Sequence, residues 1–264
     1  MRFDVITLFP ELFGPFATAG ILGRAISRGL VELKAHNLRA WAGNRWGQID
    51  DEPYGGGAGM VIQAPPALRA VRDVRDRLDD PGRLIMLSPR GRVFNQDLAA
   101  DLATSRRVIL LCGRYEGFDE RINEILEPEA VSVGDFILGG GEVAAMVLIE
   151  AAARLVPGVV GDPQSVAEDS FSAGLLDYPA YTRPADVEGR RVPDVLRSGD
   201  HGAVRAWRLQ RAVELTVTKR PDLIKTYWHR YSGDVRDMIE SLAPRLAREA
   251  RGAATNMTGE ADDA

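Results

Sequence analysis

Residues 107–117 read RVILLCGRYEG, an apolar run from Val108 to Cys112 followed by a loop with a glycine at each end. Apolar runs also lead into two similar loops, LSPRG at residues 87–91 and VGDFILGGG at residues 133–141. A short apolar run of this kind is typical of a buried strand, and open α/β sheets bind ligands at the carboxyl ends of their strands. The three loops together therefore predict a ligand-binding edge of a sheet, although each loop alone is typical of an ordinary turn.

Short apolar runs alternate with helical patterns through the first 160 residues, which predicts an α/β domain with a parallel sheet covered by helices. The expected strands cover residues 3–8, 31–40, 83–88, 107–112 and 130–133. The expected helices cover residues 10–28, 65–78, 96–103, 119–126 and 142–155. A separate stretch, YGGGAGM at residues 54–60, has no convincing secondary structure, and its glycines indicate either close backbone approach or mobility.

The pattern changes after the domain predicted over residues 1–160. Gly, Pro and polar residues dominate residues 161–176, which predicts an interdomain linker. Helices expected over residues 204–218, 221–230 and 235–248 predict a small α-helical domain over residues 177–250. The last residues, 251–264, have too few apolar side chains to pack, and we expect a disordered tail.

Composition excludes several classes of protein and of site. The chain has 264 residues, and its 45% hydrophobic and 27% charged residues are near the average for soluble globular proteins. The single Cys112 cannot form an intramolecular disulfide, and no stretch approaches the ~20 apolar residues that span a bilayer. The N-terminal sequence lacks the apolar region of a signal peptide, so we expect a cytoplasmic protein with no membrane partner. The chain has only three histidines, which argues against a zinc site, and only three lysines, which argues against a phosphate loop. It has no G-x-S-x-G sequence, which argues against a nucleophile elbow.

Basic side chains are concentrated toward the C-terminal end of the chain. The net charge is −5, but residues 183–236 hold 12 Lys and Arg against 7 Asp and Glu. This local excess predicts a surface that faces phosphate, with Arg205, Arg208 and Arg211 spaced by three on one helix. The alternative is a solvated face in a chain with a general arginine bias, because 30 of the 33 basic residues are arginine.

Three further features leave alternatives open. Residues 139–144 fit the dinucleotide fingerprint G-x-G-x-x-A with Asp162 about 20 residues later, but they follow the last strand rather than the first, which disfavours a nicotinamide oxidoreductase. Arg154 lies on the apolar stripe of its helix and either snorkels near the helix end or meets an anion. Residues 161–165 and 168–171 place carboxylates and hydroxyls in an irregular segment, which fits a catalytic loop or an Asx turn.

From Met1 to about Leu242 the chain resembles the bacterial tRNA (guanine-N1)-methyltransferases of the knotted SPOUT class. The motifs that carry the resemblance are, in order, FDVITLFPELF, YGGGAGM, LSPRG, LCGRYEGFDER, SVGDFILGGGE, GDPQSVAEDSF and LLDYPAYTRP. Each motif alone is unspecific, but the ordered series is highly specific.

The resemblance implies a fold, a cofactor and a substrate. The fold is a parallel sheet with a deep trefoil knot over roughly residues 84–142, and S-adenosylmethionine binds in the knot. The substrate is a tRNA whose guanosine immediately 3′ of the anticodon receives a methyl group on N1. The assembly is a homodimer in which the cofactor loops of one protomer face the linker and C-terminal domain of the other. The alternative is a noncatalytic RNA-binding protein on the same fold.

The resemblance also assigns individual residues, with Asp169 as the general base and Arg154 as its arginine partner. The residues that line the cofactor would be Leu87, Ser88, Pro89, Gly113, Arg114, Tyr115, Glu116, Gly117, Val133, Gly134, Asp135, Phe136, Ile137, Leu138, Gly140 and Gly141. The residues that contact RNA would be Tyr54, Gly55, Gly56, Gly57, Ser165, Ser170, Arg205 and Arg208. The family's Mg²⁺ dependence would involve Glu116, Asp169 and Asp177.

These residue types suit methylation of guanine. N1 carries a proton, so it attacks a methyl group well only when a base removes that proton, and an unperturbed Asp with a pKa of about 3.9 is poorly matched to the task. Burial beneath the docked base would raise the pKa of the Asp, and a guanidinium beside the developing O6 anion would lower that of the guanine. The family usually has proline where this chain has Ala58 and Ala144, so we expect effects on loop rigidity and cofactor affinity more than on the reaction.

Overall fold

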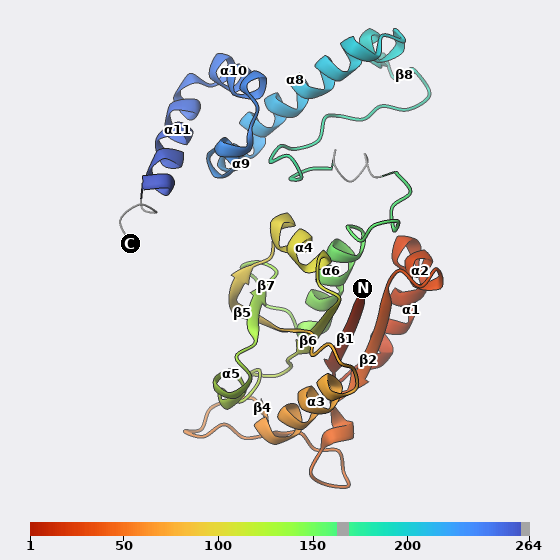
Figure 1. Cartoon of the computed structure of the whole chain (residues 1–264), viewed down its shortest axis with the longest axis vertical. Helices are drawn as coiled ribbons and strands as arrows, with labels where there is room; N and C mark the ends of the chain where they lie inside the picture. The colour runs from red at the N-terminus through yellow and green to blue at the C-terminus, as the bar shows by residue number, and fades with distance from the viewer. Residues whose placement is uncertain (163–168, 260–264) are drawn as a thin grey trace. The chain divides into compact units, whose positions relative to one another are not determined.

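A five-stranded sheet in which all neighbouring strands are parallel forms the centre of the N-terminal part of the chain (Figure 1). The computed structural model describes residues 1–162 and 169–259. In spatial order the strands are β2 (Glu32–Asn37), β1 (Arg2–Thr7), β6 (Arg107–Cys112), β5 (Arg83–Val93) and β7 (Glu129–Ser132). The predicted α/β class with a parallel sheet is confirmed.

Side chains alternate between the two faces of the sheet, and each face has its own apolar core. On β6, Val108 and Leu110 belong to one core, whereas Ile109 and Leu111 belong to the other. The helices that contribute to the first core are α1 (Phe13–Thr18), α2 (Gly20–Ser27), α4 (Gln96–Ala103) and α6 (Gly141–Ala153). Those of the second core are α3 (Ala64–Asp76), α5 (Arg121–Leu126) and the 3-10 helix η2 (Leu38–Trp41). Burial on both faces explains why β6 is a continuous apolar run.

One helix that the sequence predicts as continuous is divided in the structure, and one predicted strand is shorter. The helix predicted over residues 10–28 is divided into a 3-10 helix, η1 (Pro10–Leu12), followed by α1 and α2. The strand predicted over residues 31–40 ends at Asn37, because the Asn37 side chain accepts a hydrogen bond from the N–H of Arg39 at 3.0 Å and caps η2. Two short antiparallel strands, β3 (Asp50–Asp51) and β4 (Val61–Ile62), flank the glycine-rich stretch.

The internal contacts divide the chain into two units, Met1–Pro163 and Gln164–Ala264. The second unit has its own apolar core, which includes Val213, Ile224 and Ile239. Its described elements are β8 (Asp186–Val187), β9 (Arg190–Arg191), η3 (Asp194–Arg197), α8 (His201–Lys219), α9 (Pro221–Tyr227), η4 (Trp228–Arg230), α10 (Gly233–Leu242) and α11 (Pro244–Gly259). Residues 163–168 of the predicted linker lie outside the described residues. None of the helices in the described part of the chain has the length and apolar character that a membrane span requires.

Two predictions for the end of the chain are wrong. The helix predicted over residues 235–248 is broken between α10 and α11, because Pro244 has no N–H to continue a helix. The predicted disordered tail begins at residue 251, yet α11 continues to residue 259. Buried Ala247 and Ala250 fix this helix to the core of the second unit, and alanine has the highest helix propensity. Residues 260–264 lie outside the described residues.

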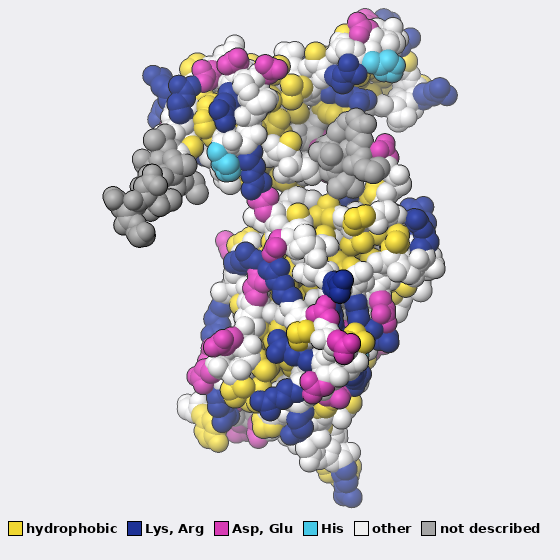
Figure 2. Space-filling view, viewed as in Figure 1, with side chains coloured by type: hydrophobic (Ala, Val, Ile, Leu, Met, Phe, Trp, Pro, Cys, Tyr) yellow, Lys and Arg dark blue, Asp and Glu magenta, His cyan; other side chains and the backbone are white. Residues whose placement is uncertain are grey.

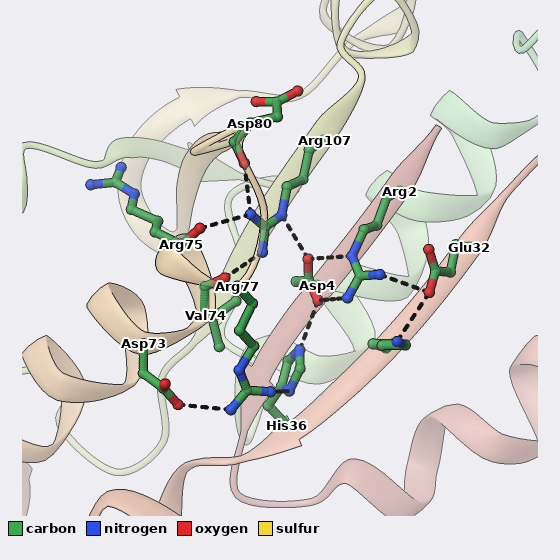
Figure 3. A network of polar contacts seen from close by, with 11 residues as sticks. Arg2, Asp4, Glu32, His36, Asp73, Val74, Arg75, Arg77, Asp80 and Arg107 are labelled. Carbon is green, nitrogen blue, oxygen red and sulfur yellow. Dashed lines mark hydrogen bonds and ion pairs between the residues drawn. The ribbon is translucent and has the colours of Figure 1, made fainter.

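A buried carboxylate on β1 ties this strand to its two neighbours, β2 and β6 (Figure 3). Asp4 is fully buried and accepts hydrogen bonds from Arg2 Nε at 2.8 Å and Arg107 Nε at 2.9 Å, while its other oxygen lies 2.7 Å from His36 Nε2. Arg107 also donates to the carbonyl oxygen of Asp80 at 2.7 Å, which joins the loop before β5 to the network. Burial alone would raise the pKa of Asp4, but the hydrogen bonds from His36, Arg2 and Arg107 hold the pKa of this carboxyl well below its usual range.

We expect the substitution Asp4→Asn to lower the free energy of unfolding by about 3–5 kcal/mol at neutral pH, because Arg107 would remain buried without its counter-charge. The pKa of Asp4 is lower in the folded than in the unfolded protein, so its contribution is complete above about pH 4 and is lost as the pH falls further. Urea unfolding at a series of pH values measures both effects. Asp73→Asn, which removes a half-exposed partner of Arg77, is the control. Equal stability of Asp4→Asn and wild type at pH 7 would contradict this role.

Candidate functional site

The carboxyl ends of β5, β6 and β7 surround a cavity of about 370 Å³. All cofactor-binding residues predicted from the sequence line this cavity except Asp135. Asp135 is the middle residue of a tight turn in which the N–H of Phe136 donates to the carbonyl of Gly134 at 3.0 Å. The lining residues that were not among the predicted cofactor-binding residues are Met86, Arg90, Phe118, Val131, Ser132, Gly139 and Ala144. Each lies within three residues of a predicted one, so they belong to the same segments as the motifs.

The first wall of the cavity is a loop that leaves the sheet and returns to it. Leu87 and Arg92 of β5 both pair with Val131 of β7, so residues 88–91 bulge out of the strand between them. The end of this bulge contacts β7 closely, because a Cβ on Gly91 would lie 2.3 Å from the backbone nitrogen of Val131. Only glycine permits this approach of two backbones. The LSPRG motif is therefore a wall of the cavity rather than a simple turn after the strand.

The second and third walls meet at a pair of glycines. Gly141, the first residue of α6, donates its N–H to the carbonyl of Gly113 at 2.9 Å. A Cβ on Gly141 would lie 2.9 Å from the Cα of Cys112, so the start of α6 touches the end of β6. Cys112 itself is fully buried, and burial raises the pKa of its thiol, which disfavours a nucleophilic role. The loop after β6 then turns at Tyr115, which has a positive φ of 59°.

The glycine-rich stretch at residues 54–60 joins the loop after β6. The N–H of Glu116 donates to the carbonyl of Met60 at 3.0 Å, and the N–H of Ile62 donates to the carbonyl of Gly117 at 2.9 Å. Gly59 has a φ of 91°, and a Cβ there would lie 2.5 Å from Oε1 of Glu116. The predicted RNA contacts Tyr54, Gly55, Gly56 and Gly57 belong to this stretch, and the Tyr54 side chain is fully exposed. The structure thus brings this stretch beside the cavity wall, a contact that sequence spacing could not show.

The two predicted catalytic residues belong to different units and neither lines the cavity. Arg154 follows α6 as its C-cap residue and is half-buried. Asp169 and Ser170 lie at the start of the described part of the second unit. Ser170 Oγ accepts a hydrogen bond from the N–H of Asp177 at 2.9 Å, so the predicted RNA contact and the predicted magnesium ligand lie side by side within the second unit. The predicted Ser165 lies outside the described residues.

Predicted phosphate-binding arginines lie on α8 of the second unit. Arg205 is exposed, and the guanidinium carbon of Arg208 lies 4.6 Å from the centre of the Tyr178 ring. Figure 2 shows dark blue Lys and Arg side chains at the surface of this unit near β8 and along α11, with acidic side chains between them. Arg211 donates to Glu214 at 2.7 Å, which reduces its availability to a phosphate.

The predicted magnesium ligands are divided between the two units of the chain. Among residues 1–162 and 169–259, no group of three or more His, Cys, Asp or Glu side chains is placed to hold a metal ion. Glu116 belongs to the first unit, whereas Asp169 and Asp177 belong to the second. Because the described residues contain no such group, we assign no chemical step to Mg²⁺.

Comparison with known proteins identifies the family. A family model described as tRNA (Guanine-1)-methyltransferase TrmD matches residues 1–226. A tRNA (guanine-N(1)-)-methyltransferase of Rhodopirellula baltica is 54% identical over 227 residues, which cover 85% of this chain and 94% of the relative. A protein of Halorhodospira halophila with the same description is 55% identical over 223 residues, 84% of each chain. The chain therefore belongs to the tRNA (guanine-N1)-methyltransferase family.

Proposed function

We propose that the protein transfers a methyl group from S-adenosylmethionine to N1 of the guanosine immediately 3′ of the anticodon in tRNA. The observation that carries the proposal is the cavity at the carboxyl edge of the sheet, which is lined by the motifs that define the resemblance. The chain that holds this cavity belongs to the tRNA (guanine-N1)-methyltransferase family. The noncatalytic alternative has no such support, because the relatives are described as methyltransferases. Since tRNA is a cytoplasmic substrate, we expect the protein to act in the cytoplasm.

The cavity suits this cofactor in size and chemistry. Pockets for ligands of this kind measure roughly 300–1,000 Å³ and are mostly apolar, and this one measures about 370 Å³. Leu87, Val133 and Ile137 supply apolar walls, and Glu116 adds an acidic residue to the lining, which favours a positively charged ligand. The glycines supply peptide groups at close range. S-adenosylmethionine carries its methyl group on a sulfonium that leaves as a neutral thioether, so the leaving group needs no acid.

The two residues proposed as catalytic handle the proton and the charge of the guanine. Asp169 accepts the N1 proton, which frees the electron pair of N1 to form the new bond to carbon. Arg154 stabilises the negative charge that develops on O6 and so lowers the pKa of N1. Docking of the base over Asp169 removes water from the carboxylate, which favours transfer of the N1 proton to it.

Access to N1 requires that the guanosine leave the anticodon stack, at a cost of a few kcal/mol. The exposed Tyr54 ring, at the start of the glycine-rich stretch, offers a stacking surface for it. We propose that residues 177–250 form the tRNA-binding domain, that residues 1–160 form the catalytic domain, and that residues 161–176 link them. Arg205 and Arg208 on α8 would then contact backbone phosphates.

We propose a trefoil knot over residues 84–142. The chain runs from β5 to β6, which lies between β5 and β1, and then returns past β5 to β7 on its far side. The bulge at residues 88–91 contacts β7 through Gly91, and the start of α6 contacts the end of β6 through Gly141. These contacts support a chain that passes through its own loops, an arrangement that protein topology otherwise avoids.

We propose that the protein acts as a homodimer, with exposed apolar side chains beside the cavity as support. Phe136 and Ile137 are 56% and 81% exposed, and Val143 and Val147, one turn apart on α6, are 55% and 45% exposed. Contiguous exposed apolar surface marks protein interfaces. A second copy would cover this surface and bring its Asp169 to the cavity of the first.

Methyl transfer itself is tested with labelled S-adenosylmethionine and tRNA transcripts that carry guanosine or adenosine 3′ of the anticodon. We expect label on N1 of the guanosine and none in the adenosine transcript. A protein that binds the cofactor and the tRNA but transfers no label would support the noncatalytic alternative.

The substitution Asp169→Ala should lower the single-turnover rate by about 10²- to 10⁴-fold, because proton removal contributes factors of this size. The affinity for tRNA should stay near the wild-type value, since the carboxylate acts on the base and not on the phosphates. Asp237→Asn, at an exposed position on α10, is the matched control. An unchanged rate for Asp169→Ala would exclude this residue as the base.

The substitution Val147→Arg should dissociate the dimer, because it places a charge on the apolar surface of α6. Val187→Arg on β8, where the valine is 54% exposed, is the control and should leave the oligomeric state unchanged. Sedimentation velocity measures both variants. A wild-type protein that sediments as a monomer and still methylates tRNA at full rate would refute the dimer.

A further inference from the structure

Glu142 is a buried acidic residue beside the cavity that none of the roles above uses. It is the second residue of α6, and its side chain is only 1% exposed. Oε1 accepts a hydrogen bond from Thr7 Oγ1 at 2.7 Å, and Oε2 accepts one from Arg114 Nε at 2.9 Å. One carboxylate therefore joins the end of β1, the loop after β6 and the start of α6.

Arg114, the partner of Glu142, is held on several sides. Its Nη1 donates to the carbonyl of Gly139 at 2.9 Å, and its guanidinium carbon lies 4.5 Å from the centre of the Phe9 ring. Its backbone also forms an antiparallel bridge with Gly140. A Cβ on Gly140 would lie 2.2 Å from Arg114 Nε and 2.6 Å from Glu142 Oε2, so the ion pair fills the space that a side chain there would need.

These contacts link two walls of the cavity. Arg114 belongs to residues 113–117 and Gly139 to residues 136–141, and both segments line the cavity. Glu142 itself is not among the lining residues, so it acts through Arg114 rather than by contact with a ligand. A carboxylate with two donors is also favourable in the first turn of a helix, where the helix dipole attracts negative charge.

We propose that Glu142 is a positioning residue that fixes, through Arg114, the spacing of the two loops that enclose the cofactor. The proposal rests on the proposed function in one respect, namely that the cavity holds S-adenosylmethionine. Loss of the Glu142 carboxylate frees Arg114 to leave Gly139, and the cavity then binds its ligand less tightly because its walls are no longer fixed in advance.

The first test compares the variants Glu142→Ala and Glu142→Gln with wild type in titrations with S-adenosylmethionine. We expect the Ala variant to raise the Kd about 10- to 100-fold, the range that corresponds to one hydrogen bond between charged groups. We expect partial recovery in the Gln variant, because its amide oxygen can accept from Arg114 while the Thr7 hydroxyl accepts from its amide nitrogen. The affinity for tRNA should remain unchanged. Glu150→Ala, at an exposed position on the same helix, is the matched control.

The second test is amide hydrogen exchange of the protein without cofactor, so it does not depend on what the cavity binds. We expect faster exchange at residues 113–117 and 139–141 in Glu142→Ala, with exchange in α3 unchanged. If wild type fails to bind S-adenosylmethionine while the exchange result holds, the proposed cofactor is wrong and the positioning role stands.

A purely structural role predicts a different outcome. In that case a folded Glu142→Ala would melt at a lower temperature but show wild-type Kd and wild-type exchange in both loops, and this result would overturn the proposal. If the Ala variant does not fold, Glu142→Gln and Thr7→Val serve instead. Each should give an intermediate Kd and intermediate exchange, and wild-type values in both would equally overturn the proposal.

Discussion

Close contact between backbones at the carboxyl edge of the sheet is the constraint on which the site depends. A Cβ on Gly91 would lie 2.3 Å from the backbone of β7, and a Cβ on Gly141 would lie 2.9 Å from that of β6. Larger residues at either position would force the loops apart. Peptide groups of these loops therefore lie in the walls of the cavity beside its apolar side chains, and they lose little entropy when a ligand binds.

Two polar networks hold the sheet that carries these loops. The network around Asp4, in the first half of β1, joins this strand to β2 and β6, and the bridge between Thr7, Glu142 and Arg114 lies at the carboxyl end of β1. Both central carboxylates are buried and fully supplied with donors, the condition under which a buried polar group adds rigidity rather than instability. Strand β1 is thus fixed at both ends, and the loops beside it are supported by a rigid element.

Sequence patterns predicted the elements whose periodicity is undisturbed. The apolar run at residues 107–112 and the helix at residues 96–103 have the predicted bounds, and the glycine-bounded loops contain nearly all residues that line the cavity. Features that depend on contacts between distant segments could not be predicted. Thr7 and Glu142 are 135 residues apart, and the second pairing of β5 with β7 becomes visible only once both strands are placed. Asp135, which was expected to line the cavity, does not do so for a local reason, because the turn around it keeps it out of the lining.

In the proposed function, cofactor binding belongs to the N-terminal unit and proton removal to a carboxylate of the second unit. The cavity at the carboxyl edge of the sheet is central to this proposal. A crystal structure of the protein with S-adenosylmethionine bound tests this most directly. We expect the cofactor between residues 86–90, 113–118 and 131–141, with Arg114 still paired to Glu142. Cofactor density elsewhere on the protein, with this cavity empty at saturating concentration, would contradict the assignment.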